Sequence, residues 1–414
     1  MNHVLGLSCV NCGREFTALG VKYHCDLCGS RGVLDVVYDY GLIRKNLTRE
    51  TLARNGERSM WRYLPLLPLG TQAMAGIQPL ITGFTPLYQA GRLASQLGIT
   101  RLFIKDDSRN PTGSLKDRAS AVAIAKAVEL KQQAVCAAST GNAASSLAGF
   151  AASADIPAFI FVPKTAPLAK QAQLLVFGAQ VFAVEGTYDE AYDLCLEAAA
   201  EFGWYNRSCA INPFLVEGKK TVALEICEQL DWDVPDVVIM AAGDGCSIAA
   251  AWKGFKEAQL LGLTDRLPRM IGVQAAGANP LTRAFAEDTP EFAYRRPRTI
   301  ADSISVGIPR NGIRALRSVR ESGGFFIDVQ DQEILSAMSR LARSTGIFAE
   351  PAGATSFAGL LSLLRSGGLS GGETVVIAVT GSGLKDVASA MTAVPQAIQI
   401  EPSLQAVKNI MGVH

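Results

Sequence analysis

From residue 83 onward, short apolar runs of strand length alternate with Ala-rich segments of helix length. This alternation constrains the fold most strongly, because it is typical of open, mostly parallel α/β sheets. The strands are expected at residues 101–104, 134–138, 158–162, 180–184, 237–242, 270–274, 324–329 and 374–380. The helices are expected at residues 116–129, 143–152, 168–177, 188–202, 218–229, 248–261, 332–345 and 352–364. So many strands predict two lobes with a cleft, and ligands in such folds bind where strands end and helices begin.

Composition excludes several classes of protein. Of the 414 residues, 49% are hydrophobic and 19% are charged, which supplies a substantial core. Because 39 Lys plus Arg balance 38 Asp plus Glu, we expect no nucleic-acid partner. We also expect no membrane span and no signal peptide, and therefore a cytoplasmic protein with reduced thiols. The only histidines are His3, His24 and His414, so an enzyme of this sequence needs Lys, Asp or Glu as its base.

Four cysteines near the N-terminus form two C-x-x-C pairs, Cys9 with Cys12 and Cys25 with Cys28. Two such turns can aim four thiolates at one tetrahedral ion, as in a zinc ribbon. We therefore expect a structural Zn²⁺ in a zinc-ribbon-like segment over residues 1–35. No ligand position is left for water, so the metal would not be catalytic. The alternative is a thiol cluster that holds no metal.

Four loops at strand-to-helix junctions carry the candidate chemistry. Loop 110–118 places Lys116 at a helix N-terminus, where the helix dipole disfavours its cation and so favours the neutral amine that Schiff-base chemistry needs. Loops 138–145 and 242–247 can present backbone N–H groups to an anion, and loop 379–386 offers hydroxyls. Taken singly, each loop also fits an ordinary helix cap, a solvated helix start or a plain connection.

The order of these motifs resembles the fold-type-II pyridoxal-phosphate enzymes and, within them, the threonine synthase family. The resemblance covers nearly the whole chain and is carried by the segments 83–87 (GFTPL), 111–118 (PTGSLKDR), 139–142 (STGN) and 380–386 (TGSGLKD). It implies an α/β fold like that of the tryptophan synthase β chain, with a large cofactor domain (residues 36–124 and 211–401), a small α/β domain (125–210) and a C-terminal tail (402–414). It also implies a homodimer and a carbon-oxygen lyase that acts on a small amino acid.

The resemblance implies a role for each matching position. Lys116 would form the Schiff base with pyridoxal phosphate and then act as general base and acid, Asn142 would contact the phenolic oxygen of the cofactor, and Thr380 would bond its pyridine nitrogen. The cofactor phosphate would lie on Gly243, Asp244, Gly245, Cys246 and Ser247. Because a carboxylate repels a phosphate, Asp244 is expected to point away or to pair with a Lys. The substrate site would include Ser114, Ser139, Thr140, Ala143 and Glu350, with Ser139 and Thr140 on the substrate carboxylate. For Glu350, a simple N-cap is the alternative.

Three positions depart from the family. Ala143 and Ala210 stand where a hydroxyl side chain is common, and Leu215 stands where an Arg is common. Since each charge-assisted hydrogen bond is worth about 1.5–3 kcal/mol, these changes predict a substrate other than O-phosphohomoserine for the β/γ-elimination or replacement. The alternatives are an authentic threonine synthase, a threonine/serine-type dehydratase or a diaminopropionate-type ammonia-lyase. In the first case another cation would bind the substrate phosphate, and the candidates are Lys164, Lys170, Lys219 and Arg310.

The remaining cysteines have structural interpretations. Cys136, Cys195, Cys209 and Cys227 are expected in the core, and Cys246 is expected to be a small packing residue. Asp302 and Ser303 lie on a loop that is expected to close over the substrate. A non-catalytic relative is the remaining alternative, and the presence of Lys116 speaks against it.

Overall fold

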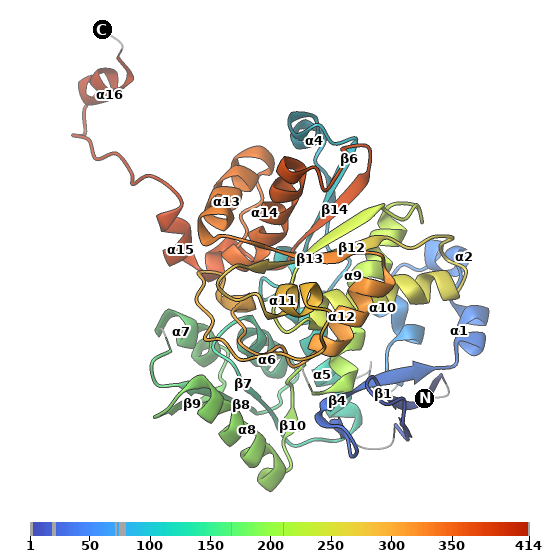
Figure 1. Cartoon of the computed structure of the whole chain (residues 1–414). Coiled ribbons are helices and arrows are strands. Elements are labelled where there is room, and N and C mark those ends of the chain that lie inside the picture. The colour runs from blue at the N-terminus through green and yellow to red at the C-terminus, as the bar shows by residue number, and fades with distance from the viewer. Residues whose placement is uncertain are drawn as a thin grey trace.

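The computed structural model describes residues 3–18, 22–70, 73, 80–166, 168–209 and 211–412. Its strands form three sheets. Two of these are largely or wholly parallel and are covered by helices (Figure 1). The α/β architecture with mostly parallel sheets that the sequence predicts is therefore confirmed.

The larger sheet has six strands in the order β13-β12-β11-β14-β6-β5. All neighbours are parallel except β5, which is antiparallel to β6. The strands are β5 (Leu87–Gln89), β6 (Arg101–Asp106), β11 (Val237–Ala241), β12 (Arg269–Ala275), β13 (Phe325–Val329) and β14 (Thr374–Val379).

Both faces of this sheet are buried, which explains why its strands are apolar almost throughout. Along β11, Val237 and Ile239 join one hydrophobic core, whereas Val238 and Met240 join another. The first core contains residues of α4 (Gly91–Leu97), α13 (Asp331–Thr345) and α14 (Pro351–Ser366). The second contains residues of α5 (Lys116–Glu129), α9 (Pro213–Gln229), α10 (Cys246–Leu260), α11 (Pro280–Ala286) and α12 (Gly312–Glu321).

The smaller parallel sheet has the order β10-β7-β8-β9. Its strands are β7 (Val135–Ala138), β8 (Ala158–Pro163), β9 (Gln180–Val184) and β10 (Tyr205–Asn206), and its helices are α6 (Asn142–Ser153), α7 (Leu168–Val176) and α8 (Tyr188–Phe202). Cys136 and Phe161 pack with Ala191 and Cys195 of α8, so Cys136 and Cys195 are core residues as expected.

An antiparallel sheet of four strands, in the order β2-β1-β4-β3, forms the N-terminal segment. It comprises β1 (Val4–Cys9), β2 (Glu15–Phe16), β3 (His24–Cys25) and β4 (Gly29–Tyr38), and α1 (Tyr40–Asn46), α2 (Arg49–Ala53) and the 3₁₀ helix η1 (Met60–Leu66) follow. Two arginines of α12 attach this sheet to the body. Arg314 donates to the Leu34 carbonyl at 2.7 Å, and Arg317 donates to the Val10 carbonyl at 2.6 Å.

The four predicted metal ligands meet in this segment. The sulfur atoms of Cys9, Cys12, Cys25 and Cys28 all lie within 4.8 Å of one another, and those of Cys12 and Cys25 are 3.7 Å apart. A Zn–S bond of about 2.3 Å places the sulfurs of a tetrahedral site roughly 3.8 Å apart. The cluster is therefore compatible with a Cys₄ zinc site.

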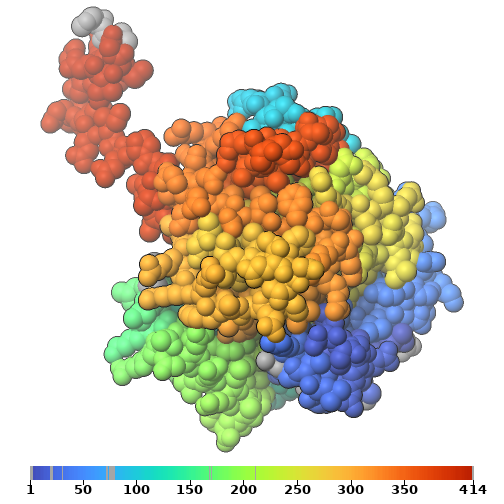
Figure 2. Space-filling view, viewed as in Figure 1, coloured from blue at the N-terminus to red at the C-terminus, as the bar shows by residue number. Residues whose placement is uncertain are grey.

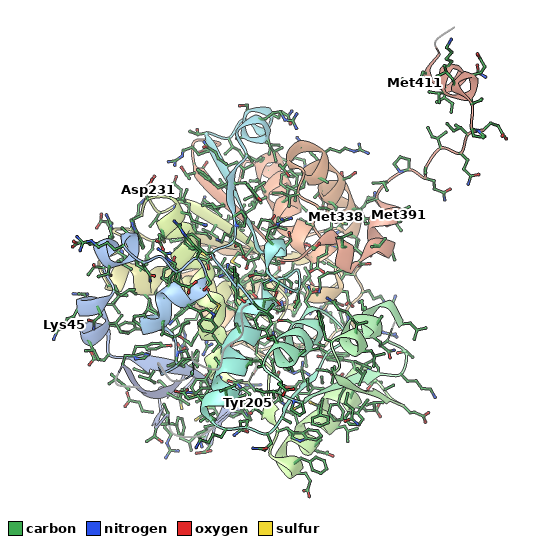
Figure 3. The ribbon with its side chains drawn as sticks, turned by 180° about the vertical axis from the view of Figure 1, so that it is seen from behind. Lys45, Tyr205, Asp231, Met338, Met391 and Met411 are labelled. Carbon is green, nitrogen blue, oxygen red and sulfur yellow. The ribbon has the colours of Figure 1, made fainter. Side chains whose placement is uncertain are left out.

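The chain ends outside the body. The short elements η2 (Asp107–Arg109), η3 (Asp302–Ile304) and η4 (Gly383–Lys385) lie in loops, and α15 (Val387–Thr392) leads to the final helix α16 (Leu404–Met411). Figures 1 and 2 show this last segment, in red, standing away from the rest of the chain, and Met411 marks it from behind in Figure 3. None of the α16 residues is buried.

Every expected strand and helix is present; β9, α5 and α8 have the expected ends, and the others are shifted. The largest shift is in α9, which begins at Pro213 rather than at residue 218, because Asn212 caps the helix and Pro occupies its first position. The expected boundaries at residues 35 and 124 fall inside β4 and α5, and the division into domains stays a prediction. Among the described residues no helix is long and apolar enough to cross a membrane.

Candidate active site

One pocket collects residues from the ends of β7, β11 and β14 and from the first turns of α5, α6 and α10. It thus lies between the two parallel sheets, where the carboxyl ends of strands meet helix N-termini. The residues predicted from the sequence that line it are Lys116, Asn142, Ala143, Gly243, Asp244, Gly245, Cys246, Ser247, Glu350 and Thr380. Segments more than 250 residues apart in the sequence therefore meet in one place.

Lys116 is the first residue of α5, and the turn before it is held by its neighbour Asp117. The buried Asp117 carboxylate accepts hydrogen bonds from the backbone N–H and the hydroxyl of Thr112, at 2.6 and 2.5 Å. The Leu115 N–H donates to the Thr380 carbonyl at 2.9 Å, which ties this turn to the end of β14. These bonds hold the backbone from which the Lys116 side chain enters the pocket.

The environment of Lys116 favours its neutral form. Burial of the amino group, with the nearby charges of Lys219 and Arg207, lowers its pKa to about 8, against opposing effects of Cys209 and Glu350. The sequence pointed to the helix dipole as the cause, but removal from water has the larger effect. A lysine of this kind presents a nucleophilic amine near neutral pH.

Arg118 anchors the helix that carries Lys116. Its guanidinium donates to both carboxylate oxygens of Asp107, at 2.8 Å each, and to both of Glu225. Asp117 and Arg118 are each 0% exposed, so the alternative of a solvated helix start is wrong for this motif. The buried side chains of Asp117 and Arg118 therefore hold in place the helix turn that carries Lys116.

The loop between β11 and α10 is suited to an anion. Gly245 occupies the N-cap of α10 with φ +85°, and a Cβ at this position would clash with that of Ala315, so only Gly fits. No side chain caps this helix, which leaves its first N–H groups available to a ligand. Asp244 Oδ1 accepts a hydrogen bond from the Arg310 backbone N–H at 3.2 Å, so the carboxylate is turned toward residue 310.

Asn142 and Glu350 form a hydrogen-bonded pair inside the pocket. Asn142 Nδ2 donates to Glu350 Oε1 at 2.7 Å and to Ser303 Oγ at 3.0 Å. Glu350 stands at the N-cap position of α14, but its side chain makes no cap hydrogen bond, so its interpretation as a simple N-cap is wrong. Burial raises the pKa of Glu350, whereas the hydrogen bond from Asn142 and the charge of Lys116 lower it. Ser303 brings the predicted substrate loop into contact with α6.

Three predicted substrate residues lie beside the pocket without lining it. Ser114 is buried, and its hydroxyl has no partner among the described residues. Ser139 Oγ accepts a hydrogen bond from the Gly141 N–H at 3.2 Å, as expected of a turn residue. Thr140 is only partly buried and belongs to the same turn. Their contact with a substrate carboxylate stays a prediction.

The positions that suggested an unusual substrate do not share one environment. Ala143 lines the pocket, whereas Leu215 is fully buried in α9 and does not line it. Ala210 lies outside the described residues. Leu215 packs in the core, and its apolar character therefore says nothing direct about the charge in the pocket.

Two of the four Lys and Arg side chains proposed for the substrate phosphate line the pocket. Lys219 is 2% exposed and lines the pocket, as does Arg310. The other two candidates do not line it, since Lys164 pairs with the exposed Glu185 and Lys170 pairs with Asp302 at 2.5 Å.

Several pocket residues gave no signal in the sequence. Tyr188 and Tyr192 stand one turn apart on α8, and Arg207 and Ser208 follow the two-residue strand β10. A strand so short leaves no periodic pattern, although an Arg directly after a strand end could have been noted. Cys209 was expected in the core, but it is only half-buried and lines the pocket, where its sulfur accepts a hydrogen bond from Arg207 Nη1 at 3.4 Å.

Comparison with known proteins agrees with this geometry. Residues 79–381 match the family model described as "Pyridoxal-phosphate dependent enzyme". A threonine synthase of Methanocaldococcus jannaschii is 41% identical over 405 residues, which cover 97% of this chain and 98% of that protein. A threonine synthase of Mycobacterium tuberculosis is 39% identical over 81% of this chain and 91% of its own length.

Solved structures of lower identity share the fold. The processed form of threonine deaminase isoform 2 from Solanum lycopersicum superposes with a TM-score of 0.64 at 23% identity, covering 78% of this chain and 91% of that one. Diaminopropionate ammonia lyase from Escherichia coli gives a TM-score of 0.64 at 21% identity over 82% of this chain and 94% of its own.

Proposed function

This chain belongs to the threonine synthase family of pyridoxal-phosphate-dependent lyases, and we propose that it converts O-phosphohomoserine and water into threonine and phosphate. One observation carries the proposal. The pocket that contains Lys116 also contains Lys219 and Arg310, which supply cations for two separate phosphates. A substrate other than O-phosphohomoserine, which the sequence favoured, has no support from the relatives, which are threonine synthases.

The pocket fits pyridoxal phosphate. The uncapped N-terminus of α10 and the buried Lys219 suit a phosphate dianion, because both favour negative charge. Lys219 has no carboxylate within ion-pair distance among the described residues, so an anionic ligand would compensate its buried charge. We assign the phosphate to residues 243–247 with Lys219, the pyridine nitrogen to the Thr380 hydroxyl and the phenolic oxygen to Asn142.

The bound cofactor would supply an aldehyde for Lys116 and an electron sink for the substrate carbanion. The residues of this chain then have distinct tasks. Lys116 Nζ, whose pKa is lowered to about 8, takes the proton from the α-carbon of the substrate. The nearby Glu350 carboxylate stabilises the resulting ammonium, and Asn142 holds that carboxylate in place through its 2.7 Å hydrogen bond.

We also propose that Cys9, Cys12, Cys25 and Cys28 hold a structural Zn²⁺. The mutual distances of their sulfur atoms, all within 4.8 Å, support this assignment. The site is far in sequence from Lys116, and four thiolates leave no open coordination position for catalysis. A homodimer and a cytoplasmic location stay predictions.

The reaction is tested by supplying O-phosphohomoserine to the purified holoenzyme and measuring phosphate, threonine and ammonia. The proposal predicts equal amounts of phosphate and threonine, with no ammonia. A dehydratase or ammonia-lyase would release ammonia and a 2-oxo acid instead, and that result would refute the proposed reaction while leaving the cofactor assignment intact.

A further inference from the structure

We propose that Arg310 is the residue that binds the leaving phosphate of the substrate, and that it selects phosphorylated amino acids. This inference rests on the proposed function and names a specificity residue for it. Four cationic side chains line the pocket, those of Lys116, Arg207, Lys219 and Arg310. Their contacts with the rest of the protein differ.

Arg207 is already committed to the protein. It is 2% exposed, its Nε donates to Ser120 Oγ at 3.1 Å, and its Nη2 donates to the Lys116 carbonyl at 3.1 Å. Its Nη1 donates to the Cys209 sulfur. A guanidinium with three of its five N–H donors engaged orients the loop beside Lys116, and fewer of its donors are free than those of Arg310.

Lys219 is 2% exposed and lines the pocket, and we assign it to the cofactor phosphate. Its charge acts on Lys116 and on Cys246, the first residue of α10. A cation placed between the cofactor lysine and the anion loop serves the cofactor. One further cation is then needed for a substrate that brings its own phosphate.

Arg310 has the properties that this second site requires. Its guanidinium makes no hydrogen bond to any described residue, it has one long ion pair, 3.7 Å, to the exposed Asp189, and the charge of the Asp244 carboxylate also acts on it. Its carbon Cζ lies 4.1 Å from the ring centroid of Tyr192, which holds the planar group in place while its edge stays open. The side chain is 33% exposed, so it stands toward the mouth of the pocket.

The backbone of Arg310 fixes the position of this side chain relative to the cofactor site. The Arg310 N–H donates to Asp244 Oδ1, and the Asn311 N–H donates to the Asp244 carbonyl, both at 3.2 Å. The backbone of residues 310 and 311 is therefore held to the anion loop by two hydrogen bonds, which places the Arg310 side chain beside that loop. A planar fork of free donors at this point matches a phosphate in bidentate geometry, which a Lys cannot reproduce.

The test compares Arg310→Gln with Arg320→Gln in the holoenzyme. Arg320 is a matched control, since it also lies over an aromatic ring, that of Phe285 at 5.1 Å, and pairs with an exposed carboxylate, that of Asp288, but it does not line the pocket. We expect Arg310→Gln to lower kcat/KM for O-phosphohomoserine by roughly 100-fold, since each charge-assisted hydrogen bond is worth about 10- to 100-fold in affinity. Inorganic phosphate should inhibit the wild type competitively and Arg310→Gln far more weakly.

Two further measurements separate specificity from a structural role. The visible absorbance of the cofactor and the affinity for L-threonine, which has no phosphate, should be the same in Arg310→Gln and wild type. The proposal would be overturned if Arg310→Gln lowered the affinity for L-threonine as much as it lowers kcat/KM for O-phosphohomoserine. An unchanged kcat/KM in Arg310→Gln would also overturn it.

The outcome also distinguishes the two proposals. If the wild type binds O-phosphohomoserine through Arg310 but forms no threonine, the proposed reaction fails and the phosphate site stands. If the wild type binds neither O-phosphohomoserine nor inorganic phosphate, the assignment of Arg310 is wrong.

Discussion

Replacing Arg118 by Met should weaken the protein at the helix that carries the cofactor lysine. The substitution keeps an apolar stem but removes four hydrogen bonds to the buried carboxylates of Asp107 and Glu225, which are 1% and 0% exposed. Breaking a buried ion pair by removing one partner costs about 3–5 kcal/mol. We expect the lower end, about 3 kcal/mol, because Lys105 still pairs with Glu225 at 2.7 Å.

The assay is urea unfolding of the holoenzyme, followed by tryptophan fluorescence, with Arg101→Met as the control. The ion pair of Arg101 with Asp233 is exposed, with side chains 42% and 54% accessible, so its loss should cost less than about 1 kcal/mol. Because α5 begins at Lys116, Arg118→Met should also bind the cofactor more weakly. Equal free energies of unfolding for the two variants, within about 1 kcal/mol, would refute the view that this network anchors α5.

Three further predictions concern the site and the N-terminal segment. Asn142→Ala should lower kcat/KM about 10- to 100-fold, because it removes the charge-assisted hydrogen bond to Glu350; steady-state kinetics measure this, and an unchanged value would contradict the role of the pair. The rate at which cofactor-free protein takes up pyridoxal phosphate should rise with pH and level off above about 8, because the neutral amine of Lys116 reacts and its pKa is lowered from 10.5 to about 8; a rise that continues toward pH 10.5 would show an ordinary lysine. Chelation should release zinc and increase hydrogen exchange more in residues 3–38 than in α5, because the metal holds the N-terminal segment together. Arg317 attaches this segment to the body through the Val10 carbonyl. Metal analysis measures the zinc, and mass spectrometry measures the exchange.

Regular elements were predictable because their patterns are local. The apolar runs of β11 and β14 follow from burial on both faces of a parallel sheet, and the ends of α5 and α8 coincide with the expected ones. The loops at strand ends could be located for the same reason. Lys116 and Asn142 begin the helices that follow such loops, and Thr380 lies in one, so their meeting at one edge of the sheets follows from the sequence pattern.

Other parts depend on contacts that a pattern does not encode. Strand β10 has two residues, so Arg207 and Cys209 gave no signal of a pocket position. Leu215 was expected beside the substrate, but its burial depends on how α9 packs against α5 and α10, which only the tertiary structure specifies. The positive charge in the pocket arises from Lys116, Arg207, Lys219 and Arg310, which no single motif connects in the sequence.

The most direct test of the account is to locate the cofactor on the chain. Borohydride reduction of the holoenzyme, followed by proteolysis and mass spectrometry, should place pyridoxal phosphate on Nζ of Lys116, and Lys116→Ala should lose the visible absorbance of the wild type. A colourless wild-type protein, or a cofactor attached to a different lysine, would contradict the central claim that this buried amine is the reactive group of the enzyme.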